Sequence, residues 1–108
     1  MAASESSQPT LGIIARIPLQ PGKRAEAIEG LQAMLANVQT EQGTITYILH
    51  EDVGNDDTLW MYELYTDQAA IDLHSSSDAM KVLGKTLAGL LAGRPELTIL
   101  RPIGGKGL

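Results

Sequence analysis

Residues 58–80 read TLWMYELYTDQAAIDLHSSSDAM, and the rest of the chain is arranged around this strand and helix. Its first half is rich in aromatic and aliphatic residues, which predicts a strand buried on both faces. Thr66 and Asp67 then offer side-chain caps for a short helix that ends at His74. The stretch therefore places a carboxylate, Glu63, inside a buried strand and an imidazole at the end of the next helix. Because burying an unpaired carboxylate is costly, Glu63 requires a structural or a functional reason.

Four segments of the chain carry the patterns of β-strands. In residues 11–18 and 44–51, apolar side chains recur at every second position, which is typical of a strand with one buried face. Residues 59–65 and 96–101 are more continuously apolar. A Gly-Asn pair at position 54 lies between the second and third strands, so we expect a hairpin connection there.

Three segments carry helical patterns. After the turn signal Pro21-Gly22, apolar residues from 25 to 38 recur at helical spacing. The short helix covers about 67–74, and the last helix carries the apolar residues between 80 and 91 and stops near Gly93. The order β-α-β-β-α-(α)-β predicts an α+β fold of the ferredoxin-like, split βαβ type. Its sheet has four antiparallel strands, with the helices on one face.

The two faces of this sheet are expected to differ. Helices cover only one face, and the alternation assigns to it Ile13, Ala15, Ile17, Tyr47, Leu49, Trp60, Tyr62 and Leu64. The helix-free face then carries the apolar residues Ile14, Ile48, Met61, Tyr65 and Ile99 and the polar residues Arg16, Thr46, His50, Glu63 and Arg101. Because a monomer rarely leaves so large an apolar patch in water, we expect a homodimer. Its polar residues are expected to line a cavity between the two sheets.

Composition limits the class of protein. A chain of 108 residues that is 44% hydrophobic suits one globular domain, which we assign to residues 10–103. Residues 1–9 are small and polar and are expected to form a disordered tail, and 104–108 a C-terminal tail. The formal net charge of −5 and the absence of any basic run argue against nucleic-acid binding.

Motifs for membrane insertion, export and cofactors are absent from the sequence. No apolar stretch approaches the roughly 20 residues of a membrane span, and the N-terminus does not resemble a signal peptide, so the cytoplasm is the expected compartment. Zero cysteines exclude disulfides and thiolate metal sites. No dinucleotide-binding glycine motif, phosphate loop or metal-spaced set of ligands is found, so we predict no cofactor and no metal.

Three parts of the sequence together resemble the antibiotic biosynthesis monooxygenase family: EQGTITY at 41–47, MYELYTDQAA at 61–70, and His74. The resemblance covers residues 11 to 101 and implies ferredoxin-like protomers that pair into a dimeric α+β barrel. The family holds quinol oxygenases, signal-degrading enzymes, haem degraders and members with no known activity. The first strand here has no Asn, and the single Trp lies early, at Trp60, which disfavours haem degradation.

The residues and the resemblance lead to two functional hypotheses. The first is a cofactor-independent monooxygenase that acts on a small aromatic, quinol or polyketide-like substrate with molecular oxygen. A deprotonated substrate of this class can pass an electron to O2 itself, inside a dry cavity. In this hypothesis His74 is the general base and Glu63 orients it. The alternative is a non-catalytic dimeric binding protein for a small hydrophobic ligand. It stays open because Ala79 stands where many family members carry a second histidine.

Each candidate residue also has a structural explanation. Glu63 could be a buried carboxylate paired with Arg16, Arg101 or a backbone donor. His74 could be hydrogen-bonded to Glu63 and fix the corner between strand and helix. The predicted substrate-binding residues all come from the expected helix-free face: Arg16, Thr46, Ile48, His50, Met61, Tyr65 and Arg101.

Overall fold

The computed structural model describes residues 10–108, so the tail predicted at residues 1–9 lies outside the described part of the chain. Its elements follow one another as β1 (Leu11–Pro18), α2 (Arg24–Asn37), the 3-10 helix η1 (Val38–Thr40), β2 (Thr44–Glu51), β3 (Thr58–Tyr65), α3 (Gln68–Ser75), α4 (Asp78–Leu87) and β4 (Glu96–Leu100). Within residues 10–108, no helix is both long enough and apolar enough to cross a membrane.

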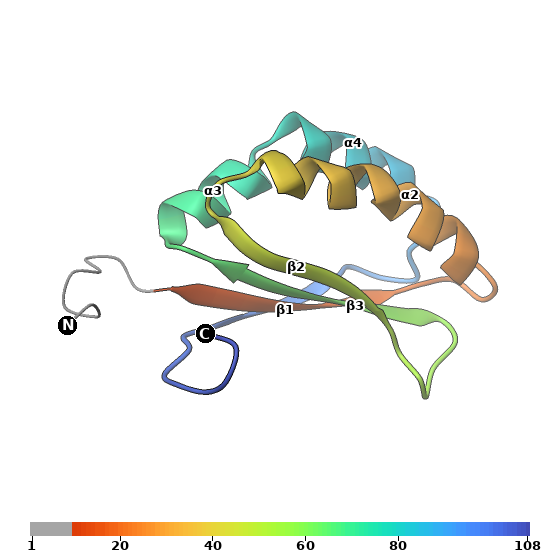
Figure 1. Cartoon of the computed structure of the whole chain (residues 1–108). Coiled ribbons are helices and arrows are strands. Elements are labelled where there is room, and N and C mark those ends of the chain that lie inside the picture. Colours follow the sequence, from red (N-terminus) through yellow and green to blue (C-terminus); the bar gives the residue numbers. More distant parts are fainter. Residues whose placement is uncertain (1–9) are drawn as a thin grey trace, which may run out of the picture.

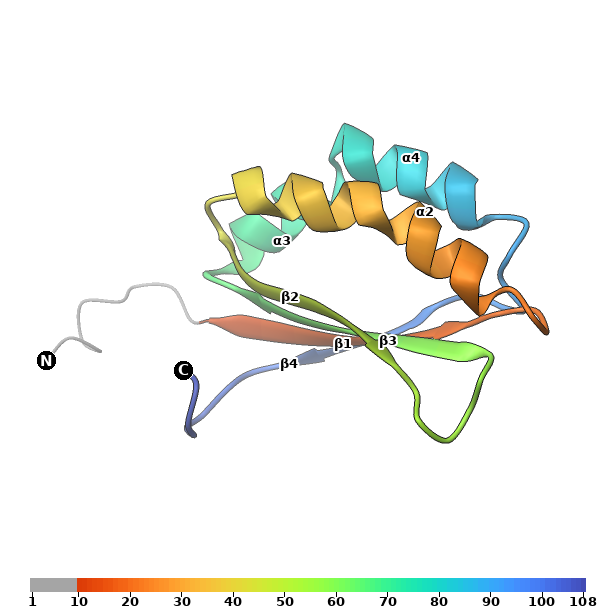
Figure 2. The same cartoon turned by 45° about the vertical axis from the view of Figure 1, so that its right-hand side comes forward.

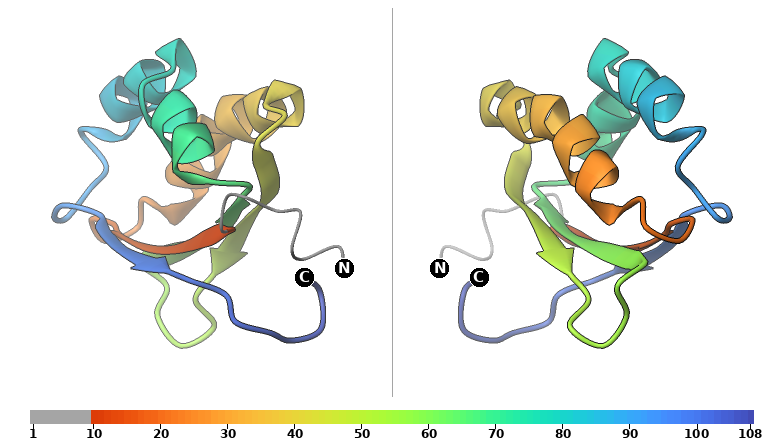
Figure 3. Two further views of the ribbon diagram at one scale, coloured as in Figure 1. Left: turned by 90° about the vertical axis from the view of Figure 1, so that its left-hand side faces the viewer. Right: turned by 90° about the vertical axis from the view of Figure 1, so that its right-hand side faces the viewer.

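The four strands form one antiparallel sheet in the order β2-β3-β1-β4. The three α-helices of residues 10–108 lie over the same face of this sheet, and in this described part of the chain the opposite face carries no helix (Figure 1; Figure 2). The end views in Figure 3 show the sheet curving beneath the helices, with α2 and α4 next to each other. This arrangement confirms the predicted α+β, ferredoxin-like fold.

The two short helices begin at the residues that their sequences favour. The side chain of Asp67 accepts a hydrogen bond from the backbone N–H of Ala70 at 2.9 Å and caps α3. Ser77 accepts from the N–H of Met80 at 3.1 Å and caps α4 in the same way. The Asp67 cap starts α3 directly after β3, so His74 near the end of this helix lies close to the end of the sheet.

The predicted end of the last helix near Gly93 was wrong, because α4 ends at Leu87. The residues after it turn back toward the end of β1. The backbone N–H of Gln20 donates to the carbonyl of Leu90 at 2.9 Å, and Leu19 forms an isolated β-bridge with Leu91. Residues 90 and 91 thus pair with residues 19 and 20, which follow β1, and do not form the last turns of the predicted helix.

The predicted assignment of β3 to the two faces was also wrong. In the register of the sheet, Ile13 lies opposite Glu63 and Ala15 opposite Met61, so Glu63 and Met61 face the helices. Tyr65 lies two residues further along the same strand face and is fully buried. The helix-free face of β3 instead carries Trp60, Tyr62 and Leu64. Because β3 is apolar on both faces, its sequence contains no alternation that fixes which side chains point inward.

Ile99 in β4 is the other apolar residue that was assigned to the wrong face. It pairs with Ile13, whose side chain faces the helices, yet 57% of Ile99 remains exposed. By contrast, Ile14 and Ile48 lie on the helix-free face as predicted, because both are in register with Tyr62. The helix-free face therefore carries Trp60, Tyr62 and Leu64 in place of the predicted Met61, Tyr65 and Ile99, so it is richer in aromatic side chains than the prediction.

The core fills the space between the sheet and the helices. Its main cluster joins α2 and α4 to the centre of the sheet, through buried residues such as Leu31, Met61 and Leu87. A smaller buried cluster joins α3 to the end of the sheet and consists of Ile13, Tyr65, Ala70 and Ile71. The candidate site lies where these two clusters meet.

Candidate active site

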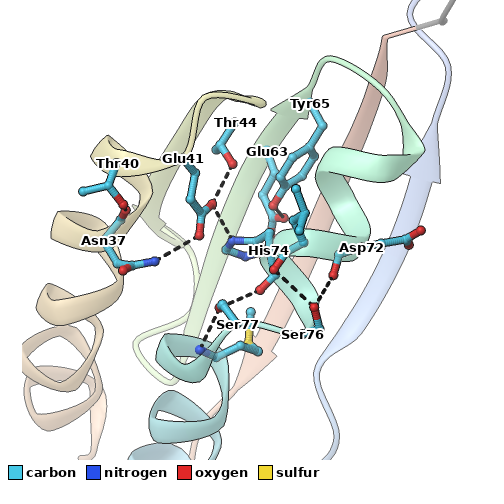
Figure 4. Close-up of polar contacts among 12 residues, drawn as sticks. Asn37, Thr40, Glu41, Thr44, Glu63, Tyr65, Asp72, His74, Ser76 and Ser77 are labelled. Carbon is cyan, nitrogen blue, oxygen red and sulfur yellow. Dashed lines mark hydrogen bonds and ion pairs between the residues drawn. The ribbon is translucent and has the colours of Figure 1, made fainter.

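A group of polar side chains is buried beneath α3. Glu63 and His74 are only 6% and 4% exposed, and Glu41, Tyr65 and His74 lie close to Glu63 (Figure 4). These residues come from β3, from α3 and from the end of η1, so segments up to 33 residues apart meet here. No group of three or more His, Cys, Asp or Glu side chains suited to a metal ion occurs in residues 10–108.

Glu63 is hydrogen-bonded to a tyrosine of its own strand. The Tyr65 hydroxyl donates to Oε1 of Glu63 at 2.5 Å, which lies at the short end of the range for O–H···O hydrogen bonds. The predicted pairing of Glu63 with Arg16 was wrong. The guanidinium of Arg16 lies on the helix-free face, 3.8 Å from the carboxylate of Glu96. Two residues apart on one strand, Glu63 and Tyr65 necessarily point to the same side of the sheet.

The environment of this pair favours protons on both groups. Burial raises the pKa of the Glu63 carboxyl, and the charge of Glu41 acts in the same direction; the Tyr65 hydrogen bond and the His74 imidazole oppose the rise. The pKa of the Tyr65 hydroxyl is also raised, first by burial and then by its bond to Glu63. Tyr65 therefore stays a hydrogen-bond donor, while Glu63 can take up a proton at a higher pH than an ordinary glutamate.

The direct partner of His74 is Glu41 and not Glu63, so the predicted Glu63–His74 hydrogen bond was wrong. Nδ1 of His74 lies 2.9 Å from Oε1 of Glu41. The same oxygen accepts from the Thr44 hydroxyl at 2.7 Å, and Oε2 accepts from the Asn37 side-chain amide at 3.0 Å. Glu41 belongs to the quoted segment EQGTITY, but nothing in the spacing of that segment assigned it a role.

The glycine of that segment explains how Glu41 reaches His74. A Cβ atom on Gly43 would overlap the side chain of Ala70, so only glycine lets this turn pack directly on α3. The backbone N–H of Thr66 also donates to the carbonyl of Gly43 at 2.9 Å. The sequence shows only that an acid lies two residues before this glycine, and nothing in it links that acid to His74, 33 residues further along the chain.

The other ring nitrogen of His74 has an unusual environment. Among residues 10–108, Nε2 of His74 is buried and has no hydrogen-bond partner. The imidazole lies near two aromatic rings, with centroid distances of 5.1 Å to Tyr47 and 5.6 Å to Tyr65. A buried unpaired nitrogen in a native cluster calls for an explanation, and a role in proton transfer is one.

A mainly apolar cavity of about 290 Å³ lies between the sheet and helices α2 and α4. Tyr47 and Glu63 supply its polar groups, and burial raises the pKa of the Tyr47 hydroxyl. The remaining lining is aliphatic or small and includes Leu31, Met61, Met80, Leu83, Gly84 and Leu97. A second cavity, of about 390 Å³ and more polar, lies beside Glu41 and His74. Glu63 and His74 therefore border different cavities.

The structure brings together only part of the predicted site. Met61 lines the apolar cavity and Tyr65 belongs to the buried cluster, although both were expected on the helix-free face. Arg101 is exposed beyond the end of β4. Four predicted substrate-binding residues lie on the helix-free face, with the sheet between them and the apolar cavity: Arg16, Thr46, Ile48 and His50. A role for these four in substrate binding stays a prediction that depends on a partner subunit.

The sequence comparisons give one family. Residues 10–85 match the sequence profile described as antibiotic biosynthesis monooxygenase. YcnE of Bacillus subtilis, provisionally assigned as a monooxygenase, is 33% identical over 63 residues, which cover 58% of this chain and 66% of that protein. The uncharacterised protein sll1783 of Synechocystis is 26% identical over 89 residues, which cover 82% of this chain and 60% of that protein. The chain thus spans less than two thirds of the length of either relative.

Solved structures with the same fold cover nearly the whole chain. A provisionally assigned antibiotic biosynthesis monooxygenase from Caulobacter crescentus superimposes with a TM-score of 0.85 at 26% identity and covers 90% of this chain and 92% of its own. The protein Rv0793 from Mycobacterium tuberculosis gives a TM-score of 0.82 at 26% identity and covers 91% of this chain and 99% of its own.

Proposed function

Because the chain belongs to the antibiotic biosynthesis monooxygenase family, we propose that it is a cofactor-independent monooxygenase of a small aromatic, quinol or polyketide-like substrate. One observation carries this proposal. Glu63, a buried carboxyl whose pKa is raised by burial, lines an apolar cavity of about 290 Å³ and lies beside His74. A cavity of this size and lining suits a small, mostly apolar ligand with one or two polar groups.

The proposed reaction needs no reductant besides the substrate. A phenol or hydroquinone with a free carbon ortho or para to a hydroxyl loses two hydrogen atoms and gains one oxygen atom to become a quinone, while the second oxygen atom of O2 leaves in water. The substrate supplies all four electrons that O2 accepts. Removal of the phenolic proton starts the reaction, because the resulting anion is electron-rich enough to reduce O2. The protein then contributes a base, orientation and the exclusion of water.

Glu63 and His74 are the candidates for handling this proton. Glu63 lines the apolar cavity, so it is the group that can meet a bound substrate. His74 lies close enough to Glu63 for the two charges to interact, and its ring packs against Tyr47, which lines the same cavity. A carboxyl with a raised pKa is better matched to proton transfer near neutral pH than an ordinary glutamate.

Oxygen uptake by the purified, flavin-free and metal-free protein, with a panel of hydroquinones and anthrones, tests the proposal. Glu63→Gln and His74→Ala are each expected to lower kcat by roughly 10² or more, as for the loss of a general acid–base group. Glu29→Gln is the matched control, because this glutamate is exposed on α2 away from the cluster and the variant should leave kcat unchanged. Full turnover by both cluster variants would refute the proposed roles. Tight binding of a panel compound without oxygen uptake would instead favour the alternative, a non-catalytic binding protein.

We also propose that the protein is a cytoplasmic homodimer that pairs through the helix-free face of the sheet. The support is the exposed apolar surface on that face, with Ile14 and Ile48 beside Tyr62. In such a dimer, four of the residues predicted from the sequence to bind substrate, Arg16, Thr46, Ile48 and His50, would lie at the interface and not in the apolar cavity.

A further inference from the structure

The carboxylate of Glu41 is surrounded by hydrogen-bond donors. Its Oε2 accepts from Asn37, and its Oε1 accepts from the Thr44 hydroxyl and lies 2.9 Å from Nδ1 of His74. An ionised carboxylate can only accept hydrogen bonds. The nitrogen of His74 that faces it must therefore carry a proton.

The opposite nitrogen of His74 is buried and has no partner among residues 10–108. If a neutral imidazole carries its single proton on Nδ1, then Nε2 is bare. A bare Nε2 is a proton acceptor inside the cluster, whereas a protonated Nε2 would be a donor buried without an acceptor, which is costly. Both ring nitrogens thus favour the same tautomer.

We infer that Glu41 is a positioning residue that fixes His74 in the Nδ1–H tautomer, so that bare Nε2 can accept a proton and Glu41 can stabilise the imidazolium that results. The role of a carboxylate behind a catalytic histidine follows the same physical logic in hydrolases. The catalytic consequence rests on the proposed monooxygenase function, but the tautomer does not.

This arrangement suits the proton balance of the proposed reaction. The conversion of a phenol and O2 into a quinone and water releases no net proton, so a proton that His74 holds can be returned to the oxygen that leaves as water. The Glu41–His74 pair is only 18% and 4% exposed, which shields such a proton from exchange with solvent. Glu41, like His74, borders the second cavity and not the apolar one, so it acts through His74 and not on the substrate.

Long-range proton–nitrogen NMR spectra of protein labelled with 15N-histidine test the tautomer directly, without any substrate. The spectra are recorded at a pH where both histidines are neutral, and His50→Gln identifies the signals of His74. In the unmodified protein, His74 is expected to show a protonated Nδ1 and a bare Nε2. In Glu41→Ala, this preference is expected to be lost. Thr44→Val is the matched control, because it removes another hydrogen bond from the same carboxylate oxygen but keeps the charge and therefore the tautomer.

Kinetics with any substrate from the oxygen-uptake panel test the consequence. Glu41→Ala is expected to lower kcat about ten-fold or more with KM changed less than about two-fold, because only transition-state interactions are lost. Thr44→Val should change kcat less than about two-fold. A protonated Nε2 in the unmodified protein, an unchanged tautomer in Glu41→Ala, or a rise in KM without a fall in kcat would overturn the inference. Absence of oxygen uptake would refute the proposed function and leave the NMR result standing.

Discussion

Glu63 experiences opposing influences on its charge. Burial disfavours the carboxylate, while the hydroxyl of Tyr65 and the imidazole of His74 favour it, and burial has the largest effect. A group in such a position lowers the stability of the fold when it ionises. Sites of this kind are retained when function needs the group, because natural proteins give up some stability for activity.

The stability of the protein should therefore depend on pH through Glu63. The folded state holds this proton to a higher pH than the unfolded chain, where a glutamate has a pKa of about 4.3. The protonated Glu63 side chain therefore stabilises the folded state fully below about pH 4.3, and this stabilisation is lost as the pH rises through the raised pKa of the folded state. Glu63→Gln cannot ionise, so its stability relative to the unmodified protein should increase between pH 4 and pH 8. Urea unfolding at both pH values measures this, and an equal difference at the two would contradict it.

Tyr65→Phe should lower the free energy of unfolding at neutral pH, whereas Glu63→Gln should raise it relative to the unmodified protein. It removes the donor 2.5 Å from Glu63 and leaves a buried carboxylate with one partner fewer, which costs about 1–3 kcal/mol of unfolding free energy. Tyr62→Phe, on the helix-free face of the same strand, is the control and should stay within about 0.5 kcal/mol. Chemical unfolding at pH 7 compares the two. Equal stabilities would show that the Tyr65 hydroxyl does not support Glu63.

At the scale of the elements, the strands were predictable and the orientation of one of them was not. The alternating apolar residues of β1 and β2 fixed both their bounds and their inward faces. In β3 both faces are apolar, so only the pairing of Ile13 with Glu63 shows which side chains point to the helices. The catalytic candidates in β3 and α3 could be found from sequence, because a buried acid and a nearby histidine are conspicuous. Glu41 could not, because its contact with His74 spans 33 residues.

The contact between the turn before β2 and helix α3 should depend on Gly43. In Gly43→Ala, the new methyl group meets Ala70, which is expected to cost about 1–3 kcal/mol of stability through overpacking and to move Glu41 away from His74. The double variant Gly43→Ala with Ala70→Gly should recover most of this loss, since the two positions share one space. Thermal unfolding of the four proteins measures the coupling. Additive effects would contradict the packing argument.

Gly84 in α4 provides a contrasting glycine. A Cβ atom there would meet nothing within 4 Å, so Gly84→Ala should stabilise the helix by about 0.5–1 kcal/mol. Gly84 also lines the apolar cavity, so a larger side chain at this position should obstruct it. Gly84→Leu is therefore expected to raise KM for a cavity-bound substrate while the Glu63–His74 cluster stays intact. An unchanged KM in Gly84→Leu would place the substrate elsewhere.

At the scale of the whole molecule, the helix-free face of the sheet is the surface that a second copy would cover. Ile48 is 49% exposed there, so Ile48→Asp should place a charge in the interface and shift the mass from dimer to monomer. Met61 is unsuitable for this test, because it is 2% exposed in the core and its replacement by Asp would unfold the protein. Light scattering at micromolar concentration measures the mass. A stable monomer of the unmodified protein would contradict the proposed dimer.

Incorporation of oxygen from 18O2 tests for a monooxygenase reaction in the apolar cavity beside Glu63. The protein, free of flavin and metal, is given a phenol or anthrone that supports oxygen uptake, and the product is analysed by mass spectrometry. We expect one 18O atom per product molecule, one O2 consumed per product, and loss of this reaction in both Glu63→Gln and His74→Ala. A product without 18O, or labelling at the same rate in both variants, would contradict it.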